Sequence, residues 1–296
     1  MIAVLCSEFF GKRIVNALQE KNVKAIYVPK SVEQGDQLKK ELKDHDIIHF
    51  VTSPTIFFKE FRTLIRCRFW RKKIVVNWIG ADVRRVLSKP FWRFVTKISQ
   101  PLIDVNIATS QNLVTELNSI GVKAKFQPIP VYSIYDLREL TSENKIAVYL
   151  PDRTEEEFQF YQGDMIKKLV KEFPSVEFLI IRNSGRNFNE KNAKCLEWVE
   201  DMEEIYNQVK CVIRLPLHDG TSGTVVETLS MGRSMIAFNT ELPYCRIINN
   251  YDELKKHLSS VISEAKLNKD ASIFIHENYN NSKLADDLIS IYKSIK

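Results

Sequence analysis

The sequence has few cysteines and no long apolar run. Its 296 residues contain five cysteines, an odd number scattered without paired metal-binding spacing, and several of them lie in apolar segments. This pattern predicts reduced core thiols in a cytosolic protein. No apolar run approaches the roughly 18–20 residues that cross a bilayer, and residues 1–6 lack the basic start of a signal peptide. We therefore expect a cytoplasmic protein without a membrane-spanning segment.

Motifs for nucleophilic or metal-dependent catalysis are missing as well. The sequence contains no Ser-His-Asp constellation, no P-loop pattern, and no His, Cys and carboxylate residues at metal-ligand spacing. It therefore predicts no metal ion and no cofactor. Low-complexity tracts and short repeats are also lacking, and the length suits two domains of roughly 130–160 residues.

Charge is distributed unevenly between the two halves of the chain. Residues 1–135 hold 22 Lys and Arg against 11 Asp and Glu, a balance of +11, whereas residues 136–296 hold 21 against 26, a balance of −5. The two halves are therefore expected to face different partners, or to attract one another across a cleft.

Short apolar runs alternate with helical patterns along the chain. The predicted strands cover residues 2–6, 25–28, 46–51, 73–79, 105–108, 125–131, 145–150, 177–182, 196–199, 211–215 and 235–238. The predicted helices include residues 11–20, 34–43, 57–66, 110–119, 155–173, 202–207, 223–231 and 252–267. Such alternation predicts parallel sheets with helices on both faces. Because it occurs twice, we expect an α/β protein with two Rossmann-like domains.

The apolar periodicity lapses once, at residues 132–143. We therefore place the first domain at residues 1–135 and the second at residues 144–281. Residues 282–296 form a final predicted helix with an apolar stripe that suits packing back on the first domain.

The most informative segment is the loop and short helix at residues 218–232. Ser222 is a good N-cap and Gly232 a good helix terminator, so the loop directs backbone N–H groups and the positive end of a helix dipole at one point. Such a point suits a phosphate. Glu227, about one turn into the helix, could accept hydrogen bonds from sugar hydroxyls. The segment therefore predicts a nucleotide or nucleotide-sugar site.

Residues 218–232 also resemble the donor-site motif of retaining GT-B glycosyltransferases of family 4. That motif has two acidic residues separated by seven others, as Asp219 and Glu227 are here. The resemblance implies that Glu227 holds the ribose of the donor and that Asp219 contacts the transferred sugar, with a shorter reach than the usual Glu. It extends over most of the chain. It implies two Rossmann-like domains facing across a cleft, with the C-terminal helix crossing back to the first.

The resemblance assigns further donor-site roles. Arg153 matches the first cation that clamps the diphosphate, a task that suits a guanidinium fork. The second cation is replaced by Gln162, so either Arg182 or Arg214 substitutes for it or donor binding is weaker than usual in the family. Gly11 falls where the family has a glycine-rich turn near the donor phosphates. The predicted donor-binding residues are Gly11, Arg153, Arg182, Gly220, Thr221, Ser222, Gly223, Thr224 and Glu227.

The predicted catalytic residues are Asp82, Asp219 and His49. Asp82 closes a segment, Asn77-Trp78-Ile79-Gly80-Ala81-Asp82, that resembles the acceptor-domain loop of the same enzymes. It is expected to orient a sugar hydroxyl or the acceptor. Many relatives carry a histidine where this loop has Ile79, so any role of that residue is either missing or supplied by His49 or His218. The alternative for His49 is a buried core histidine.

Residues 57–97 combine cations with aromatic side chains. Residues 59–97 hold 12 Lys and Arg against two acidic residues, with phenylalanines and tryptophans between them. On a helix, Lys59, Arg62 and Arg66 share one face, which is typical of a helix at a membrane surface. The predicted membrane or acceptor contacts are Arg62, Arg66, Arg71 and Lys72. The alternatives are an ordinary amphipathic helix with a solvated basic side, or a surface for single-stranded nucleic acid, which is the least favoured partner.

Together these features favour a metal-independent glycosyltransferase that uses a nucleotide-diphosphate sugar. The resemblance implies retention of configuration. The acceptor is expected to be a glycan or a lipid-linked or membrane-proximal molecule, with the protein peripheral on the inner face of the cell membrane. The alternatives are a nucleotide-sugar epimerase, which needs acid–base groups flanking the sugar, and a non-catalytic relative that binds sugar or nucleic acid.

Overall fold

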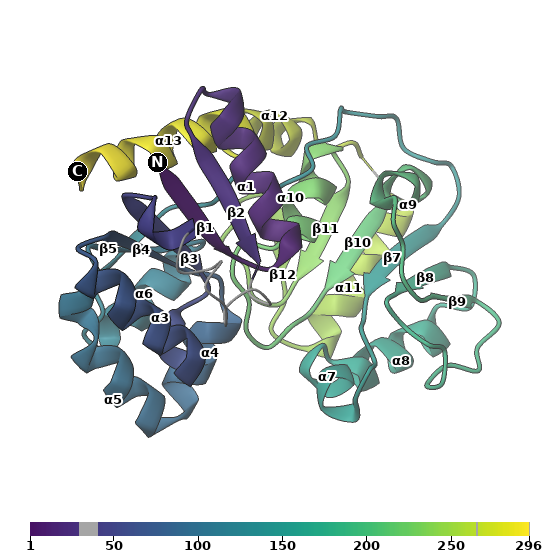
Figure 1. Cartoon of the computed structure of the whole chain (residues 1–296). Helices are drawn as coiled ribbons and strands as arrows, with labels where there is room; N and C mark the ends of the chain where they lie inside the picture. Colours follow the sequence, from purple (N-terminus) through teal and green to yellow (C-terminus); the bar gives the residue numbers. More distant parts are fainter. Residues whose placement is uncertain (30–40, 265, 296) are drawn as a thin grey trace. The chain divides into compact units, whose positions relative to one another are not determined.

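The chain folds into two compact units, each built around one parallel sheet (Figure 1). This computed structural model describes residues 1–29, 41–264 and 266–295. Unit 1 comprises Met1–Tyr132 and Asn278–Lys296, and unit 2 comprises Ser133–Glu277. The chain therefore leaves unit 1, forms all of unit 2, and returns. Among the described residues, no helix is both long and apolar enough to cross a membrane.

Unit 1 contains a six-stranded sheet with the order β2-β1-β3-β4-β5-β6. Its strands are β1 (Ile2–Cys6), β2 (Ala25–Pro29), β3 (Ile47–Val51), β4 (Lys73–Trp78), β5 (Val105–Ala108) and β6 (Ala124–Phe126). Its helices are α1 (Glu8–Glu20), η2 (Pro54–Ile56), α3 (Phe58–Phe69), α4 (Ala81–Ser88), α5 (Pro90–Ile98), η3 (Gln100–Leu102), α6 (Gln111–Ser119) and α13 (Asn281–Ser294). Every residue of β1 and β3 is buried, as expected for central parallel strands covered on both faces.

Helix α13 belongs to unit 1 and packs on α1. Its buried residues are Leu284, Ala285, Leu288 and Tyr292. Two polar contacts add to this apolar stripe. Lys21 forms an ion pair with Asp286 at 2.6 Å, and the Asn281 side-chain amide donates to the Tyr132 carbonyl at 2.8 Å.

Unit 2 contains a second six-stranded parallel sheet with the order β12-β11-β10-β7-β8-β9. Its strands are β7 (Lys145–Tyr149), β8 (Glu177–Ile181), β9 (Ala193–Leu196), β10 (Cys211–Arg214), β11 (Ser234–Ala237) and β12 (Cys245–Ile247). Its helices are α7 (Glu155–Phe160), α8 (Gly163–Glu172), α9 (Met202–Gln208), α10 (Gly223–Ser230), α11 (Tyr251–Ser263) and α12 (Lys269–Asn278). From β7 the chain adds strands first on one side and then, from β10, on the other. Loops at the carboxyl ends of β7 and β10 thus flank a topological switch point, where open α/β sheets bind ligands.

A buried arginine donates hydrogen bonds to the backbone of an irregular segment of unit 2. Arg233 is fully buried and donates to three backbone carbonyls, those of Tyr206 at 2.9 Å, Arg138 at 2.6 Å and Glu139 at 2.9 Å. Burial lowers the pKa of its guanidinium below the ordinary value of arginine. Because a buried charge is tolerated only when it is well hydrogen-bonded, this arrangement holds the backbone around residues 138–139, which has no regular secondary structure.

Several predicted elements differ from the structure. The helix predicted at 155–173 is two helices, because Gln162 adopts a left-handed conformation (φ 61°) between α7 and α8. The Phe158 ring lies 2.2 Å from where a Cβ on Gly163 would be, so only glycine permits this packing. The strand predicted at 196–199 is instead β9, which ends at Leu196. Apart from its last three residues, the helix predicted at 34–43 lies outside the described residues.

Candidate functional site

The loop after β10 and helix α10 form the centre of the candidate site. Ser222 occupies the N-cap position of α10 as predicted, but its hydroxyl makes no hydrogen bond with the first turn, so that part of the prediction is wrong. The helix ends as predicted, since Gly232 has φ +74°. The first turn of α10, with Gly223 and Thr224, therefore begins beside the carboxyl end of β10, at the switch point of the sheet.

Asp219 is held by an arginine from the end of β10. The Arg214 Nε donates to Oδ2 of Asp219 at 2.9 Å, and its terminal nitrogen forms an ion pair with the same oxygen at 2.8 Å. The Arg214 guanidinium also lies over the Tyr149 and Tyr161 rings, at 4.6 and 5.3 Å from their centroids. On its other oxygen, Asp219 accepts from the backbone N–H of Gly220 at 3.0 Å.

The environment of Arg214 keeps the guanidinium charged although it is buried. Burial acts to lower the pKa of Arg214, but the negative charge of Asp219 opposes it, and the pKa ends above its ordinary value. The structure thus places a permanent buried cation between the ends of β7 and β10. Of the two substitutes predicted for the missing second cation, only Arg214 lies at this switch point.

Glu227 is half-buried on the first turns of α10. The Tyr206 hydroxyl, from α9, donates to its Oε2 at 3.0 Å. Its Oε1 lies 3.5 Å from where a Cβ on Gly223 would be, so the carboxylate folds back over the N-terminal turn of the helix. Burial and the Glu227 charge raise the pKa of Tyr206 well above 10. Tyr206 therefore stays a hydrogen-bond donor and orients the carboxylate.

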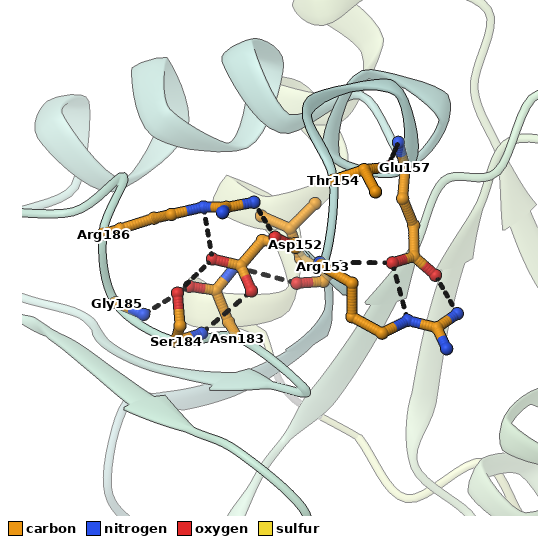
Figure 2. Close-up of polar contacts among 9 residues, drawn as sticks. Asp152, Arg153, Thr154, Glu157, Asn183, Ser184, Gly185 and Arg186 are labelled. Carbon is orange, nitrogen blue, oxygen red and sulfur yellow. Dashed lines mark hydrogen bonds and ion pairs between the residues drawn. The ribbon is translucent and has the colours of Figure 1, made fainter.

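Arg153 lies in the loop after β7 and is already paired, as Figure 2 shows. Its Nε and one terminal nitrogen donate to the two carboxylate oxygens of Glu157 at 3.0 and 2.7 Å. Its side chain is 74% exposed, and an exposed i,i+4 ion pair contributes only about 0.3–0.5 kcal/mol. A diphosphate could replace Glu157 as the partner of Arg153 at little cost.

The loops after β7 and β8 are bound to one another (Figure 2). Asp152 is buried and accepts from the Ser184 hydroxyl at 2.6 Å and the Ser184 backbone N–H at 3.0 Å. The Asn183 side-chain amide donates to the Leu150 carbonyl at 2.9 Å. Arg186 forms an ion pair with Asp152 at 3.4 Å. These contacts hold the two loops together at the edge of the sheet beside Arg153.

Arg182 follows β8 at the same edge of the sheet. It has a left-handed backbone (φ 62°), and its guanidinium lies 4.8 Å from the ring centroid of Trp198. Trp198 is largely exposed. Nothing in the sequence singled out Trp198 or the tyrosines at positions 149, 161 and 206. A tryptophan shortly after a predicted strand was the one available signal, because the tyrosines gain their roles only through tertiary contacts.

Asp82 of unit 1 is buried and organises the backbone around it. Its side chain is 1% exposed, and its two oxygens accept four backbone N–H bonds, from Ser53 at 2.9 Å, Ile79 at 3.1 Å, Gly80 at 3.1 Å and Val83 at 3.0 Å. Burial raises its pKa, and these hydrogen bonds act in the opposite direction. These contacts account for Asp82 as a structural residue of its loop, and its role toward a sugar or acceptor stays a prediction.

His49 lies in the core of unit 1, as in the alternative that the sequence left open. It is fully buried on β3, and its Nδ1 lies 2.7 Å from the Tyr292 hydroxyl of α13. Its Nε2 has no hydrogen-bond partner among the described residues. Burial lowers the pKa of His49 from 6.5 to about 3, so the ring is neutral and out of reach of a substrate.

The buried state of His49 predicts a pH-dependent stability. The unfolded chain binds a proton below about pH 6.5 and the folded chain only near pH 3, so stability should fall as the pH drops through this window. Between pH 6.5 and 5 we expect a loss of about 2 kcal/mol from this group. Urea denaturation of the wild type and of His49→Gln across this range measures it. A slope unchanged in His49→Gln would contradict the assignment.

Gly11 lies within α1, whereas the sequence predicted a turn. A Cβ there would lie 2.1 Å from the Tyr27 ring, so glycine permits the packing of this helix on the sheet.

The four predicted membrane or acceptor cations lie in two places. Arg62 and Arg66 are exposed on α3. Arg71 and Lys72 follow that helix, and the Lys72 ammonium donates to the Lys43 carbonyl.

The two parallel Rossmann-like sheets define the GT-B fold of glycosyltransferases, which confirms the predicted fold class. Sucrose-phosphate synthase from Thermosynechococcus elongatus superposes with a TM-score of 0.76 at 10% identity, over 99% of this chain and 98% of that one. The Anabaena protein HepE, in complex with UDP-glucose, gives 0.73 at 11% identity, over 99% of both chains. A glycosyltransferase from Rickettsia africae gives 0.69 at 11% identity, over 99% and 98%. No protein-family model and no curated protein matches the sequence.

Proposed function

We propose that the protein is a glycosyltransferase that takes a sugar from a nucleotide-diphosphate donor bound to unit 2. The observation that carries this proposal is the grouping of Arg214, Asp219 and Glu227 around the first turn of α10 at the switch point. The fold it shares with HepE, which was crystallised with UDP-glucose, supports a nucleotide sugar as the ligand. A uridine nucleotide is therefore the first donor to test.

Each group has a task in the proposed donor complex. Glu227 accepts hydrogen bonds from the ribose hydroxyls, with Tyr206 fixing its orientation. The N-terminal turn of α10, at Gly223 and Thr224, and the Arg153 guanidinium bind the diphosphate. Asp219 faces a hydroxyl of the transferred sugar, and Arg214 holds Asp219 in place and adds positive charge near the leaving diphosphate.

The finer features of the reaction follow the resemblance to family 4. We propose transfer with retention of configuration and without a metal ion, because cations and helix N–H groups can take over the stabilisation of the leaving diphosphate. We propose an acceptor that is lipid-linked or lies close to a membrane, and a cytoplasmic protein. Asp82 and His49, two of the groups that the sequence offered for acid–base chemistry, are both buried, which leaves an epimerase fewer candidate residues.

A ligand-dependent melting screen tests the function directly. UDP-, GDP- and ADP-sugars are added at millimolar concentration, and selective binding of one class should raise the melting temperature, because a ligand at 100 times its Kd stabilises by about 2.7 kcal/mol. Product analysis then follows with the bound donor. Release or transfer of the sugar supports the proposal. A new sugar epimer formed without acceptor would indicate an isomerase, and no shift with any nucleotide sugar would contradict the proposal.

A further inference from the structure

Helix α3 carries an apolar stripe on the side away from the core. Its buried residues, Glu60, Thr63, Leu64 and Cys67, face the sheet. Phe58, Ile65 and Phe69 follow one another at intervals of seven and four residues and are 65%, 46% and 84% exposed. A helix of a globular protein normally turns its apolar stripe to the core. Here a second stripe faces outward, which core packing does not explain.

Helix α5 repeats this feature. It buries Trp92 and Thr96, while Phe91, Phe94 and Ile98 are each more than half exposed. Their spacing of three and four residues places these three side chains on one flank of the helix. The aromatic residues are evident in the sequence, but their exposed side follows only from the packing of the helix.

The two stripes adjoin. At the N-terminal ends of the helices the Phe58 and Phe91 ring centroids are 6.1 Å apart, and Phe58 also lies 5.1 Å from Trp92. Helix α3 also contacts η3, which directly follows α5. The two helices are therefore neighbours in unit 1, joined at their N-terminal ends by these rings. We call their outward side chains the apolar patch: Phe58, Ile65, Phe69, Phe91, Phe94 and Ile98.

Exposed cations accompany the apolar patch without exposed carboxylates. Helix α3 contributes Lys59, Arg62 and Arg66, and α5 with its N-cap contributes Lys89, Arg93 and Lys97. The single carboxylate on either helix is Glu60, which is buried. The surface thus combines large apolar side chains with positive charge alone.

We propose that the apolar patch and its six cations form a docking surface for an anionic lipid bilayer. Phenylalanine and isoleucine side chains would enter the boundary between headgroups and acyl chains, and the arginines and lysines would lie at the level of the lipid phosphates. Charge complementarity favours this occupant. Six cations near an anionic leaflet, at roughly 1 kcal/mol each, suffice for reversible attachment without a spanning helix.

Vesicle sedimentation tests the proposal. The full chain is mixed with vesicles of phosphatidylcholine alone or with 30% phosphatidylglycerol, a probe composition chosen for its charge. We expect selective binding to the anionic vesicles that weakens with salt. Arg62→Glu, Arg66→Glu and Arg93→Glu together should reduce it about 100-fold or more. Phe58→Ser, Phe69→Ser and Phe94→Ser together should reduce it at least tenfold, since apolar insertion adds to the electrostatic term.

Matched controls test whether binding depends on this surface itself or only on the net charge and exposed apolar area of the whole protein. Lys191→Glu, Lys194→Glu and Lys256→Glu make the same change in net charge at exposed positions of unit 2 and should leave binding unchanged. Phe126→Ser, Ile247→Ser and Ile273→Ser remove exposed apolar side chains elsewhere. All variants should keep the wild-type melting temperature and any shift with nucleotide sugars, so the two proposals can fail independently. Equal binding to neutral vesicles, equal loss in the controls, or binding to single-stranded nucleic acid but not to vesicles would overturn the proposal.

Discussion

Glu227→Ala should weaken binding of the nucleotide-sugar donor by about 100-fold, because hydrogen bonds to a charged carboxylate contribute roughly 1.5–3 kcal/mol each. In the proposed complex the carboxylate accepts from two ribose hydroxyls. It lies over the first turn of α10, with Oε1 next to Gly223, where few other acceptors could replace it. Isothermal titration with the donor found in the melting screen measures the change in Kd.

The controls for Glu227 distinguish hydrogen bonding from charge and from folding. Glu227→Gln keeps the shape and loses the charge, so we expect an intermediate loss. Tyr206→Phe removes the hydroxyl that donates to Glu227 at 3.0 Å and should cost only a few-fold in affinity, as the carboxylate stays present but less well oriented. Since the Glu227 charge opposes a nearby diphosphate, unchanged or tighter binding in a folded Glu227→Ala protein would show that the ribose does not bind there.

Arg214→Met should destabilise unit 2 by about 3–5 kcal/mol, the usual result of removing one partner of a buried ion pair. Methionine fills a similar volume between Tyr149 and Tyr161 but leaves the Asp219 carboxylate, which is 20% exposed, without its cation. Hydrogen exchange of unit 2 amides under increasing urea follows this loss separately from unit 1. Donor binding should weaken as well, because Asp219 loses its position.

A double variant tests the cause of the stability loss in Arg214→Met. If this loss arises because the Asp219 carboxylate has lost its cation, adding Asp219→Asn should recover part of the stability. Such coupling is expected for residues in direct contact. Arg182→Met is the matched control. Its guanidinium contacts the exposed Trp198 at the same edge of the sheet and should cost less than about 1 kcal/mol. Equal losses in Arg182→Met and Arg214→Met would contradict the role given to the buried pair.

The sequence predicted the fold well because its signals are local. The strand, loop and helix at residues 211–230 are marked by an apolar run, a serine N-cap position and a terminating Gly232, all of which act over a few residues. The split at Gln162 was missed, since it depends on the Phe158 ring occupying the space beside Gly163. That contact forms only in the folded chain, so the sequence alone does not reveal it.

The candidate site was predictable in outline and not in its supporting contacts. The spacing of Asp219 and Glu227 marks two carboxylates, but their partners come from β10 and α9 and are set by tertiary packing. The surroundings of Asp82 were not predictable either. Its donors are backbone N–H groups, which every residue except proline supplies, so the sequence carries no signal for them. Helix α3 has two apolar faces by periodicity, and packing alone decides which one is buried.

The return of the chain to unit 1 has a consequence for biosynthesis. Residues 278–295 are translated after all of unit 2, so the sheet of unit 1 is made first but receives the contacts of α13 last. Until then His49 and the neighbouring surface of α1 lack the helix that packs on them. Domains usually fold in the order of their synthesis. In this chain the unit that begins first is completed last, and a chain cut before residue 278 would keep all of unit 2 but leave that surface of unit 1 exposed.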